Sequence, residues 1–255
     1  MTFAAAGTPE VAGAHALSVV IPAYNEAQRL APHLGPILAY LHEHYPDFEL
    51  IIVDDGSTDD TAAAIAAALA GEPRARVLTY KPNRGKGYAI RTGVMASSGE
   101  ALVFLDADLS TPIEEIPAAL AHLRQADIVI GSRDLPSSDI RVPQPIFRRL
   151  ASEIFKWARY LMVGLWGIAD TQCGFKAYRG PLARQLFALA HVDRFMFDVE
   201  ILYLAERAGL RVEEMPVRWT DSPGSKVRFW EGLVNMVHDL WRIRRLHPQR
   251  PRIAR

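Results

Sequence analysis

Short apolar runs alternate with amphipathic stretches through the first half of the chain, and this alternation restricts the possible folds more than any other feature. Residues 17–22 and 49–54 form apolar runs that are bounded by turn-forming residues and are too short for helices of that composition. Between them, residues 27–44 carry leucine and isoleucine at helical spacing. Because parallel strands need a crossover connection, which is usually a helix, this order predicts a β-α-β unit.

The same alternation continues as far as residue 132. It favours an α/β fold with an open, mostly parallel sheet and helices on both faces. The further strands are expected at residues 76–80, 101–106 and 128–132, and the further helices at residues 59–69, 87–97 and 112–124.

The second half has a mostly helical pattern, and no long glycine- or serine-rich linker separates it from the first. We therefore expect one domain over residues 17–246, with a ligand-binding half at 17–133 and a helical, amphipathic appendage at 134–246. A loose tail at 1–16 and a basic tail at 247–255 are expected to flank it. Within the second half, helices are expected at residues 145–167, 197–208 and 229–246, and one strand at residues 212–219.

Composition excludes several classes of protein. The 29 Lys and Arg residues balance the 29 Asp and Glu residues, so no overall field attracts nucleic acid. Cys173 is the only cysteine, which excludes an intramolecular disulfide and a cysteine-based zinc site. The opening residues lack the pattern of a secretory signal, and no apolar stretch reaches the about 20 residues that a transmembrane helix needs. A cytoplasmic protein is expected.

Polar and charged residues follow four of the predicted strands. Ligands of open parallel sheets bind outside the carboxyl ends of the strands, where the strand-to-helix loops meet. Acidic residues gathered there repel one another unless a cation or hydrogen-bond donors join them. A divalent metal together with a sugar nucleotide supplies both the cation and the hydrogen-bond donors. The four segments are Pro22-Ala23-Tyr24-Asn25-Glu26, Asp54-Asp55, Asp106-Ala107-Asp108 and Arg133.

Each segment alone has a plainer interpretation. Asp106 and Asp108 offer two hard oxygen ligands that suit Mg²⁺ or Mn²⁺, but a lone Asp-x-Asp is also typical of a solvated turn. Asn25 could cap a helix, and Asp54 could form an Asx-turn. Because these plainer interpretations would have to hold at several strand ends at once, we favour one shared nucleotide site.

In this order, the motifs resemble the inverting nucleotide-diphospho-sugar transferases of glycosyltransferase family 2, which have the GT-A fold. The matching runs over residues 17 to about 133 are Pro-x-Tyr-Asn-Glu, Asp-Asp-Gly-Ser-x-Asp, Asn83-Arg-Gly-Lys-Gly87 and Asp-x-Asp. Within the family, later motifs are similar to those of dolichyl-phosphate β-glucosyltransferases and polyprenyl-phosphate sugar synthases. These are Asp170-Thr-Gln-Cys-Gly-Phe-Lys176, Phe197-Asp-Val-Glu200 and Gly224-Ser-Lys226, and they extend the match to about residue 244.

The resemblance implies roles for the donor site. Glu26 and Asp54 would contact the uridine, while Asp106 and Asp108 would hold a Mg²⁺ or Mn²⁺ ion and the diphosphate. Ser110 would be a third metal-proximal residue, with capping of the following helix as the alternative. The other donor-site residues that it implies are Pro22, Ala23, Tyr24, Asn25, Asp55, Arg84, Lys86, Gly87 and Ala107.

It also implies a lipid monophosphate as the acceptor, attacking the anomeric carbon with inversion. A phosphate monoester has a second pKa near 6, so it is largely anionic at neutral pH and needs no strong base. Catalysis should then depend on cations and positioning. Arg133, Arg148 with Ser152 one turn later, and Lys226 are the implied phosphate ligands. A solvated helix face is the alternative interpretation for Arg148.

Other residues of the later motifs keep open roles. Asp198 is a candidate catalytic carboxylate, either as a base or, as we favour, for orientation and charge balance. Cys173 is expected to be a packed small residue. The remaining motif residues are Asp170, Gln172, Gly174, Lys176 and Glu200.

Two segments suggest contact with a membrane. Residues 146–163 mix aromatic and aliphatic side chains with arginine and lysine, which suits a helix in the headgroup region, although a core-packed helix is the alternative. The chain beyond Trp241 carries six arginines and no acidic residue. Because the sequence lacks the hydrophobic N-terminal anchor of the eukaryotic members, peripheral attachment to the cytoplasmic face is expected.

The sequence thus predicts a metal-assisted transfer of glucose from UDP-glucose to a polyprenyl (dolichyl or undecaprenyl) monophosphate. The alternatives are GDP-mannose as donor, a non-lipid acceptor, or a non-catalytic sugar-nucleotide sensor or membrane scaffold. A dinucleotide oxidoreductase is disfavoured because no G-x-G-x-x-G follows the first strand. The intact Asp106 and Asp108 argue against a degenerate site.

Overall fold

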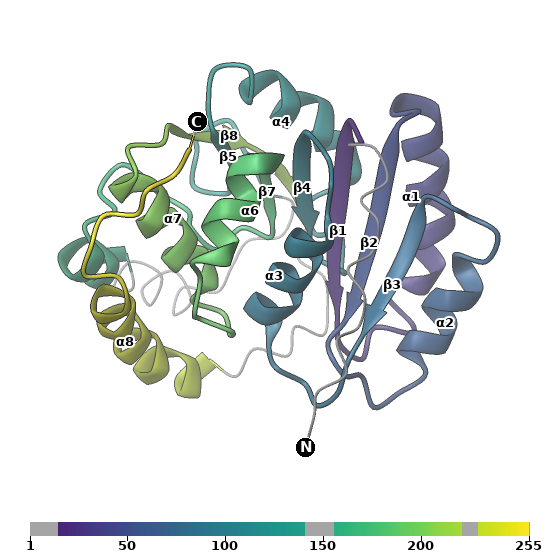
Figure 1. Cartoon of the computed structure of the whole chain (residues 1–255), viewed down its shortest axis with the longest axis horizontal. Helices are drawn as coiled ribbons and strands as arrows, with labels where there is room; N and C mark the ends of the chain where they lie inside the picture. The colour runs from purple at the N-terminus through teal and green to yellow at the C-terminus, as the bar shows by residue number, and fades with distance from the viewer. Residues whose placement is uncertain (1–14, 141–155, 221–228, 255) are drawn as a thin grey trace.

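A mixed seven-stranded sheet runs through the centre of the molecule (Figure 1). The structure, a computed structural model, describes residues 15–140, 156–220 and 229–254. The strand order is β3-β2-β1-β4-β7-β5-β8, and β6 and β9 pair in a separate two-stranded sheet. The bounds are β1 Leu17–Ala23, β2 Phe48–Asp54, β3 Ala75–Thr79, β4 Ala101–Leu105, β5 Ile128–Ser132, β6 Asp139–Ile140, β7 Phe175–Arg179, β8 Val212–Pro216 and β9 Arg218–Trp219.

The N-terminal half of the sheet is parallel, as predicted. β1 pairs in parallel with β2 from Leu17 opposite Phe48 to Ala23 opposite Asp54, and with β4 on its other side. Every residue of β1 and β2 is buried. Strands covered on both faces have continuous apolar runs, which explains why these two were recognisable from sequence.

One strand prediction was wrong, and β6 and β7 were not predicted. β7 lies between β4 and β5 and is antiparallel to both. Its run contains Lys176 and Arg179, and these charges hide the apolar pattern of a buried strand. The single strand expected at residues 212–219 is instead two, because β8 pairs with β5 while β9 leaves the main sheet to pair with β6.

The helices cover the two faces of the sheet in two groups. Alternate residues of β1 point to opposite faces, with Val20 in one core cluster and Val19 and Ile21 in the other. Helices α3, α6, α7 and α8 pack on the Val20 face, and α1, α2 and α4 pack on the other. The bounds are α1 Ala31–His44, α2 Thr61–Ala68, α3 Lys86–Ala96, η1 Ile113–Glu115, α4 Ile116–His122, α6 Gly180–Ala188, α7 Phe197–Arg207 and α8 Phe229–Leu246.

The helix predictions agree with the structure apart from three details. Helix α6 was not expected, the predicted helix at 112–124 begins as the 3₁₀ turn η1, and α1 begins only at Ala31. Residues 156–163 are helical, and the earlier part of the helix expected at 145–167 lies outside the described residues. Within the described ranges, no helix combines the length and the apolar character needed to cross a bilayer.

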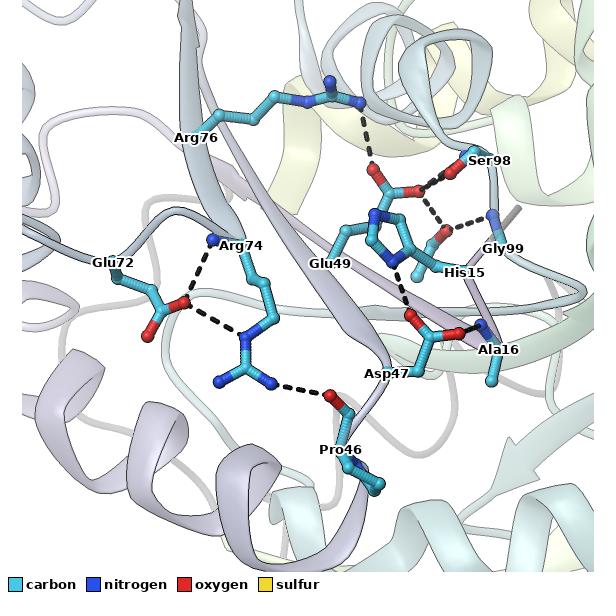
Figure 2. A network of polar contacts seen from close by, with 11 residues as sticks. His15, Ala16, Pro46, Asp47, Glu49, Glu72, Arg74, Arg76, Ser98 and Gly99 are labelled. Carbon is cyan, nitrogen blue, oxygen red and sulfur yellow. Dashed lines mark hydrogen bonds and ion pairs between the residues drawn. The ribbon is translucent and has the colours of Figure 1, made fainter. Parts of the chain in front are cut away.

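A buried carboxylate joins three strands at the amino edge of the sheet (Figure 2). Glu49, near the start of β2, accepts hydrogen bonds from the Ser18 hydroxyl at 2.6 Å and the Ser98 amide at 2.5 Å, and Arg76 Nη2 of β3 lies 3.0 Å from its other oxygen. The Gly99 amide in turn donates to Ser18 Oγ at 2.8 Å. This network fixes the end of the sheet opposite the predicted ligand site.

Candidate active site

The loops after β1 and β2 are joined to each other at the carboxyl edge of the sheet. Asn25 has a positive φ of 54°, and its amide donates to Ser57 Oγ at 2.9 Å. The side-chain oxygen of Asn25 accepts from the Thr58 amide at 2.8 Å, and the Glu26 amide donates to Thr61 Oγ1 at 2.7 Å. Several residues predicted to bind the sugar-nucleotide donor lie here. Pro22 and Ala23 end β1, and Tyr24 is partly exposed. Glu26 is buried and paired with Arg29.

Asp54 and Asp55 are both buried but have different surroundings. Asp54 accepts a hydrogen bond from the Ser57 amide at 3.1 Å. The two carboxylate oxygens of Asp55 accept hydrogen bonds from Tyr80 at 2.9 Å and from three donors of residues 83–85, each at 2.8 Å. Asp55 therefore organises the segment that carries Arg84 and Lys86. Its predicted direct contact with the donor stays a prediction.

Two lysine–aspartate pairs lie beyond the carboxyl end of β4. Lys86, the first residue of α3, places Nζ 2.6 Å from Asp106 Oδ1. Lys176 on β7 places Nζ 2.6 Å from Asp198 Oδ1 at the start of α7, and these two side chains are 0% and 4% exposed. Lys176 also donates to the Cys173 carbonyl at 2.7 Å. The fold thus brings together motifs that lie about a hundred residues apart.

The two pairs interact electrostatically. Burial raises the pKa of Asp198, against the opposing attraction of Lys176 and Lys86. For Lys86, burial lowers the pKa, but the negative charges of Asp106 and Asp198 outweigh it, so the pKa is raised overall. Lys86 is therefore held in its charged form between two carboxylates.

The Asp-x-Asp segment forms a sharp turn directly after β4. The Asp106 amide donates to the Gly174 carbonyl at 3.0 Å, and a Cβ at Gly174 would lie 1.9 Å from Asp106 Oδ2. Only glycine leaves room for the carboxylate at that point. Leu109 has a positive φ of 47°, and the Ser110 amide donates to Asp108 Oδ1 at 3.0 Å.

The donor set of this turn suits a divalent metal only if a ligand supplies further oxygens. Among the described residues, no three His, Cys, Asp or Glu side chains gather into a metal-binding group. Asp106 and Asp108 are both partly exposed, and carboxylate oxygens are the ligands that Mg²⁺ and Mn²⁺ prefer. Two carboxylates fit an ion that is completed by diphosphate oxygens and water.

Arg133 and Asp170 form a bidentate pair between the end of β5 and the loop before β7. Arg133 Nε lies 2.7 Å from Asp170 Oδ2 and Nη2 lies 3.0 Å from Oδ1. Although burial opposes it, the charge of Arg133 lowers the pKa of Asp170 to about 2. Glu214 accepts hydrogen bonds from the amides of Ala169 and Asp170, at 2.8 and 3.0 Å. The role of Arg133 as an acceptor-phosphate ligand stays a prediction, since much of its fork contacts Asp170.

Other predicted residues lie away from these pairs or outside the described chain. Glu200 is fully buried on α7 and accepts hydrogen bonds from the amides of His191 and Val192. The Gln172 amide donates to Asp170 at 3.0 Å. The implied phosphate ligands Arg148, Ser152 and Lys226 lie outside the described residues.

Sequence reasoning missed Asp193, which contacts the start of α3 from the loop before α7. Its carbonyl accepts from the Tyr88 amide at 3.0 Å, and its carboxylate lies 2.5 Å from Arg91 Nη2. No motif contains Asp193, so the sequence carries no signal for this contact.

Comparison with solved structures identifies the class of fold. A structure of glucosyl-3-phosphoglycerate synthase from Mycobacterium tuberculosis, in complex with Mn²⁺, UDP-glucose and phosphoglyceric acid, aligns with a TM-score of 0.64. The match covers 90% of this chain and 78% of that one at 20% identity. A second structure, described as a mycobacterial protein, aligns with a TM-score of 0.63 at 22% identity, over 90% of this chain and 73% of that one. These neighbours confirm the GT-A-like fold.

Comparison of sequences identifies the family. The model of glycosyl transferase family 2 matches residues 18–187. Proteins named dolichyl-phosphate beta-glucosyltransferase are 41% identical in Drosophila melanogaster and 38% identical in Homo sapiens. Each match covers 89% of this chain and 74% of the relative. The chain belongs to glycosyltransferase family 2 and is a glycosyltransferase.

Proposed function

We propose that this enzyme transfers glucose from UDP-glucose to the phosphate of a polyprenyl phosphate. The names of the fly and human relatives support glucose as the sugar and a polyprenyl phosphate as the acceptor. The solved neighbour that binds UDP-glucose supports the donor. The observation that carries the proposal is the charge pattern at the sheet edge, where Lys86 Nζ lies 2.6 Å from Asp106 Oδ1 and Asp108 follows two residues later.

Asp106 and Asp108 would hold a Mg²⁺ or Mn²⁺ ion together with the donor diphosphate. When bound, the ion would offset the negative charge on the departing UDP. Lys86 supplies a second positive charge at the same edge, and the hydrogen bonds to Asp55 hold its loop in place. Preorganised cations of this kind stabilise charge that develops in the transition state.

The acceptor phosphate would attack the anomeric carbon while the bond from that carbon to the UDP oxygen breaks. Because the phosphate is already largely anionic at neutral pH, no base has to remove a proton. Asp198 is 4% exposed and paired with Lys176, which makes it unsuited to contact an acceptor directly. We assign Asp198 to charge balance, one of the two roles that the sequence favours.

An aromatic surface supports contact with the bilayer that carries the acceptor. Trp157, Leu161 and Trp166 are 59%, 71% and 59% exposed, and Trp241 of α8 is 51% exposed. Arg244 Nη1 donates to the Met162 carbonyl at 3.3 Å, which joins α8 to the segment 156–163. Tryptophan next to arginine is typical of surfaces that lie at the headgroup level.

Transfer of radiolabelled glucose into an organic-extractable lipid tests the proposal. Purified enzyme with polyprenyl phosphate and Mg²⁺ or Mn²⁺ is expected to label the lipid from UDP-glucose, but not in EDTA. GDP-mannose and Asp108→Asn are the controls, and both are expected to give little product. A nucleotide panel in a thermal-shift assay checks the donor separately, because stabilisation by GDP and none by UDP would contradict the uridine assignment.

A further inference from the structure

Glu200 and His247 form a buried contact that the proposed function does not use. Glu200 on α7 is fully buried, and one of its carboxylate oxygens lies 2.7 Å from His247 Nε2. His247 directly follows α8, and its ring stacks on that of His191 with a centroid distance of 5.5 Å. The same carboxylate accepts hydrogen bonds from the amides of His191 and Val192, at 3.0 and 2.8 Å.

The loop that Glu200 holds contacts the start of α3 closely. A Cβ at Gly87 would lie 2.6 Å from the Val192 carbonyl oxygen, and one at Gly85 would lie 2.6 Å from the Asp193 carbonyl oxygen. The Tyr88 amide donates to that Asp193 oxygen. The loop therefore fixes the backbone on both sides of Lys86.

Lys86 depends on this backbone for its position. A lysine side chain is a flexible four-carbon stem, so Nζ reaches a given partner only while the backbone that carries it is held within that reach. Here Nζ is 2.6 Å from Asp106, which belongs to the proposed donor site. Charge-assisted hydrogen bonds to a buried carboxylate, such as those of Glu200, are about twice as strong as neutral ones.

We infer that Glu200 and His247 are positioning residues for Lys86, so that the segment following α8 completes the donor site. His247 contacts Glu200, Glu200 holds residues 191 and 192, and this loop holds the start of α3. The name donor site rests on the proposed function, but the chain of contacts does not. The C-terminal segment thus has a structural role in addition to the proposed contact with lipid.

The structure supplies a matched control. The C-terminal segment is also attached through Gln185, which exchanges two hydrogen bonds with Ala254 at 3.1 and 2.8 Å. Gln185→Ala removes this attachment and leaves Glu200 and the loop unchanged. His247→Phe keeps an aromatic ring to stack on His191 but removes the hydrogen bond. His247→Gln keeps a hydrogen-bond donor.

Hydrogen exchange and nucleotide binding together test the inference. In His247→Phe, we expect amide exchange in residues 84–93 and 190–193 to become about tenfold faster, since the loop opens more often. The Kd of UDP with Mn²⁺ is expected to rise about 3- to 10-fold, which lies within the range found for coupling through packed networks. His247→Gln should restore most of both properties, and Gln185→Ala should change neither.

Unchanged exchange in residues 84–93 of His247→Phe would overturn the inference, as would equal effects of His247→Phe and Gln185→Ala. A failure of the proposed function is distinguishable, because hydrogen exchange needs no nucleotide. If wild-type enzyme bound no UDP, the donor assignment would fall, while the exchange data would still decide whether His247 holds the start of α3.

Discussion

Single side chains decide the electrostatics of the candidate site. Lys176 is fully buried, and its charge is balanced by Asp198, which is only 4% exposed. Burying one charge without its partner costs several kcal/mol, whereas a complete pair is tolerated. The two residues should therefore behave as a unit in mutational experiments.

Removing one charge of this pair should cost more than removing both. We expect Lys176→Met to lower the free energy of unfolding by about 3 kcal/mol, because Asp198 is left buried without the positive charge that contacts it directly. Lys176→Met combined with Asp198→Asn should recover at least part of the loss. Urea unfolding monitored by circular dichroism measures both. Additive losses in the double variant would show that the pair is not coupled.

Gly174 should be intolerant of even one added methyl group. Its Cβ would lie 1.9 Å from Asp106 Oδ2, so Gly174→Ala must displace the carboxylate. We expect kcat/KM to fall about a hundredfold, because displacing a catalytic group by about 1 Å can lower the rate by that factor. Gly167→Ala is the matched control, because no atom lies within 4 Å of its Cβ. Similar kcat/KM values for the two variants would contradict the steric argument.

At the scale of elements, pairs of charges join strands that are distant in sequence. Arg133 follows β5, and Asp170 lies in the loop before β7. Their bidentate contact therefore holds the end of β5 next to the loop that leads into β7. The depressed pKa of Asp170 means that the folded state favours the ionised form. The contact is therefore a pH-dependent part of the stability.

The sign of that dependence follows from the direction of the shift. Asp170 has a pKa of about 2 when folded against an ordinary value of 3.8, so its contribution is present above pH 4 and is lost between about pH 4 and pH 2. We expect this contribution to the free energy of unfolding to be about 2 kcal/mol, because one pKa unit corresponds to about 1.4 kcal/mol. Asp170→Asn should lack it, so the unfolding free energies of wild type and variant should converge on acidification. Parallel curves would falsify the assignment.

At the scale of the whole molecule, the chain has no net charge, so the proposed contact with a membrane depends on a local surface. Trp157, Leu161 and Trp166 form its exposed apolar part. Their neighbours in α8 include basic residues in the last turn. Such a surface should prefer anionic lipid and respond to salt.

Vesicle sedimentation tests this surface. We expect the double substitution Trp157→Ser and Leu161→Ser to weaken binding to anionic vesicles by about tenfold or more, from the apolar area lost. Met95→Ser, at a 50% exposed residue of α3, is the control and should bind as wild type does. If the double variant sediments like the control, these residues are not the lipid contact.

The amino-acid sequence alone predicts the parallel half of the sheet and the positions of its acidic loops. Strands buried on both faces carry unbroken apolar runs, and strand ends at one edge bring Asp54 and Asp106 to one side without any knowledge of packing. Family motifs added the expectation of a glycosyltransferase, which the relatives confirm.

Which charged side chains contact each other depends on how the elements pack. The sequence gives Lys176 no partner. In the structure, β7 lies antiparallel between β4 and β5, and Lys176 on this strand contacts Asp198. His247, in what was predicted as a basic tail, contacts a carboxylate that lies 47 residues earlier in the sequence. Local periodicity reports burial and spacing along one element, whereas partners that are distant in the chain are fixed by the packing of whole elements.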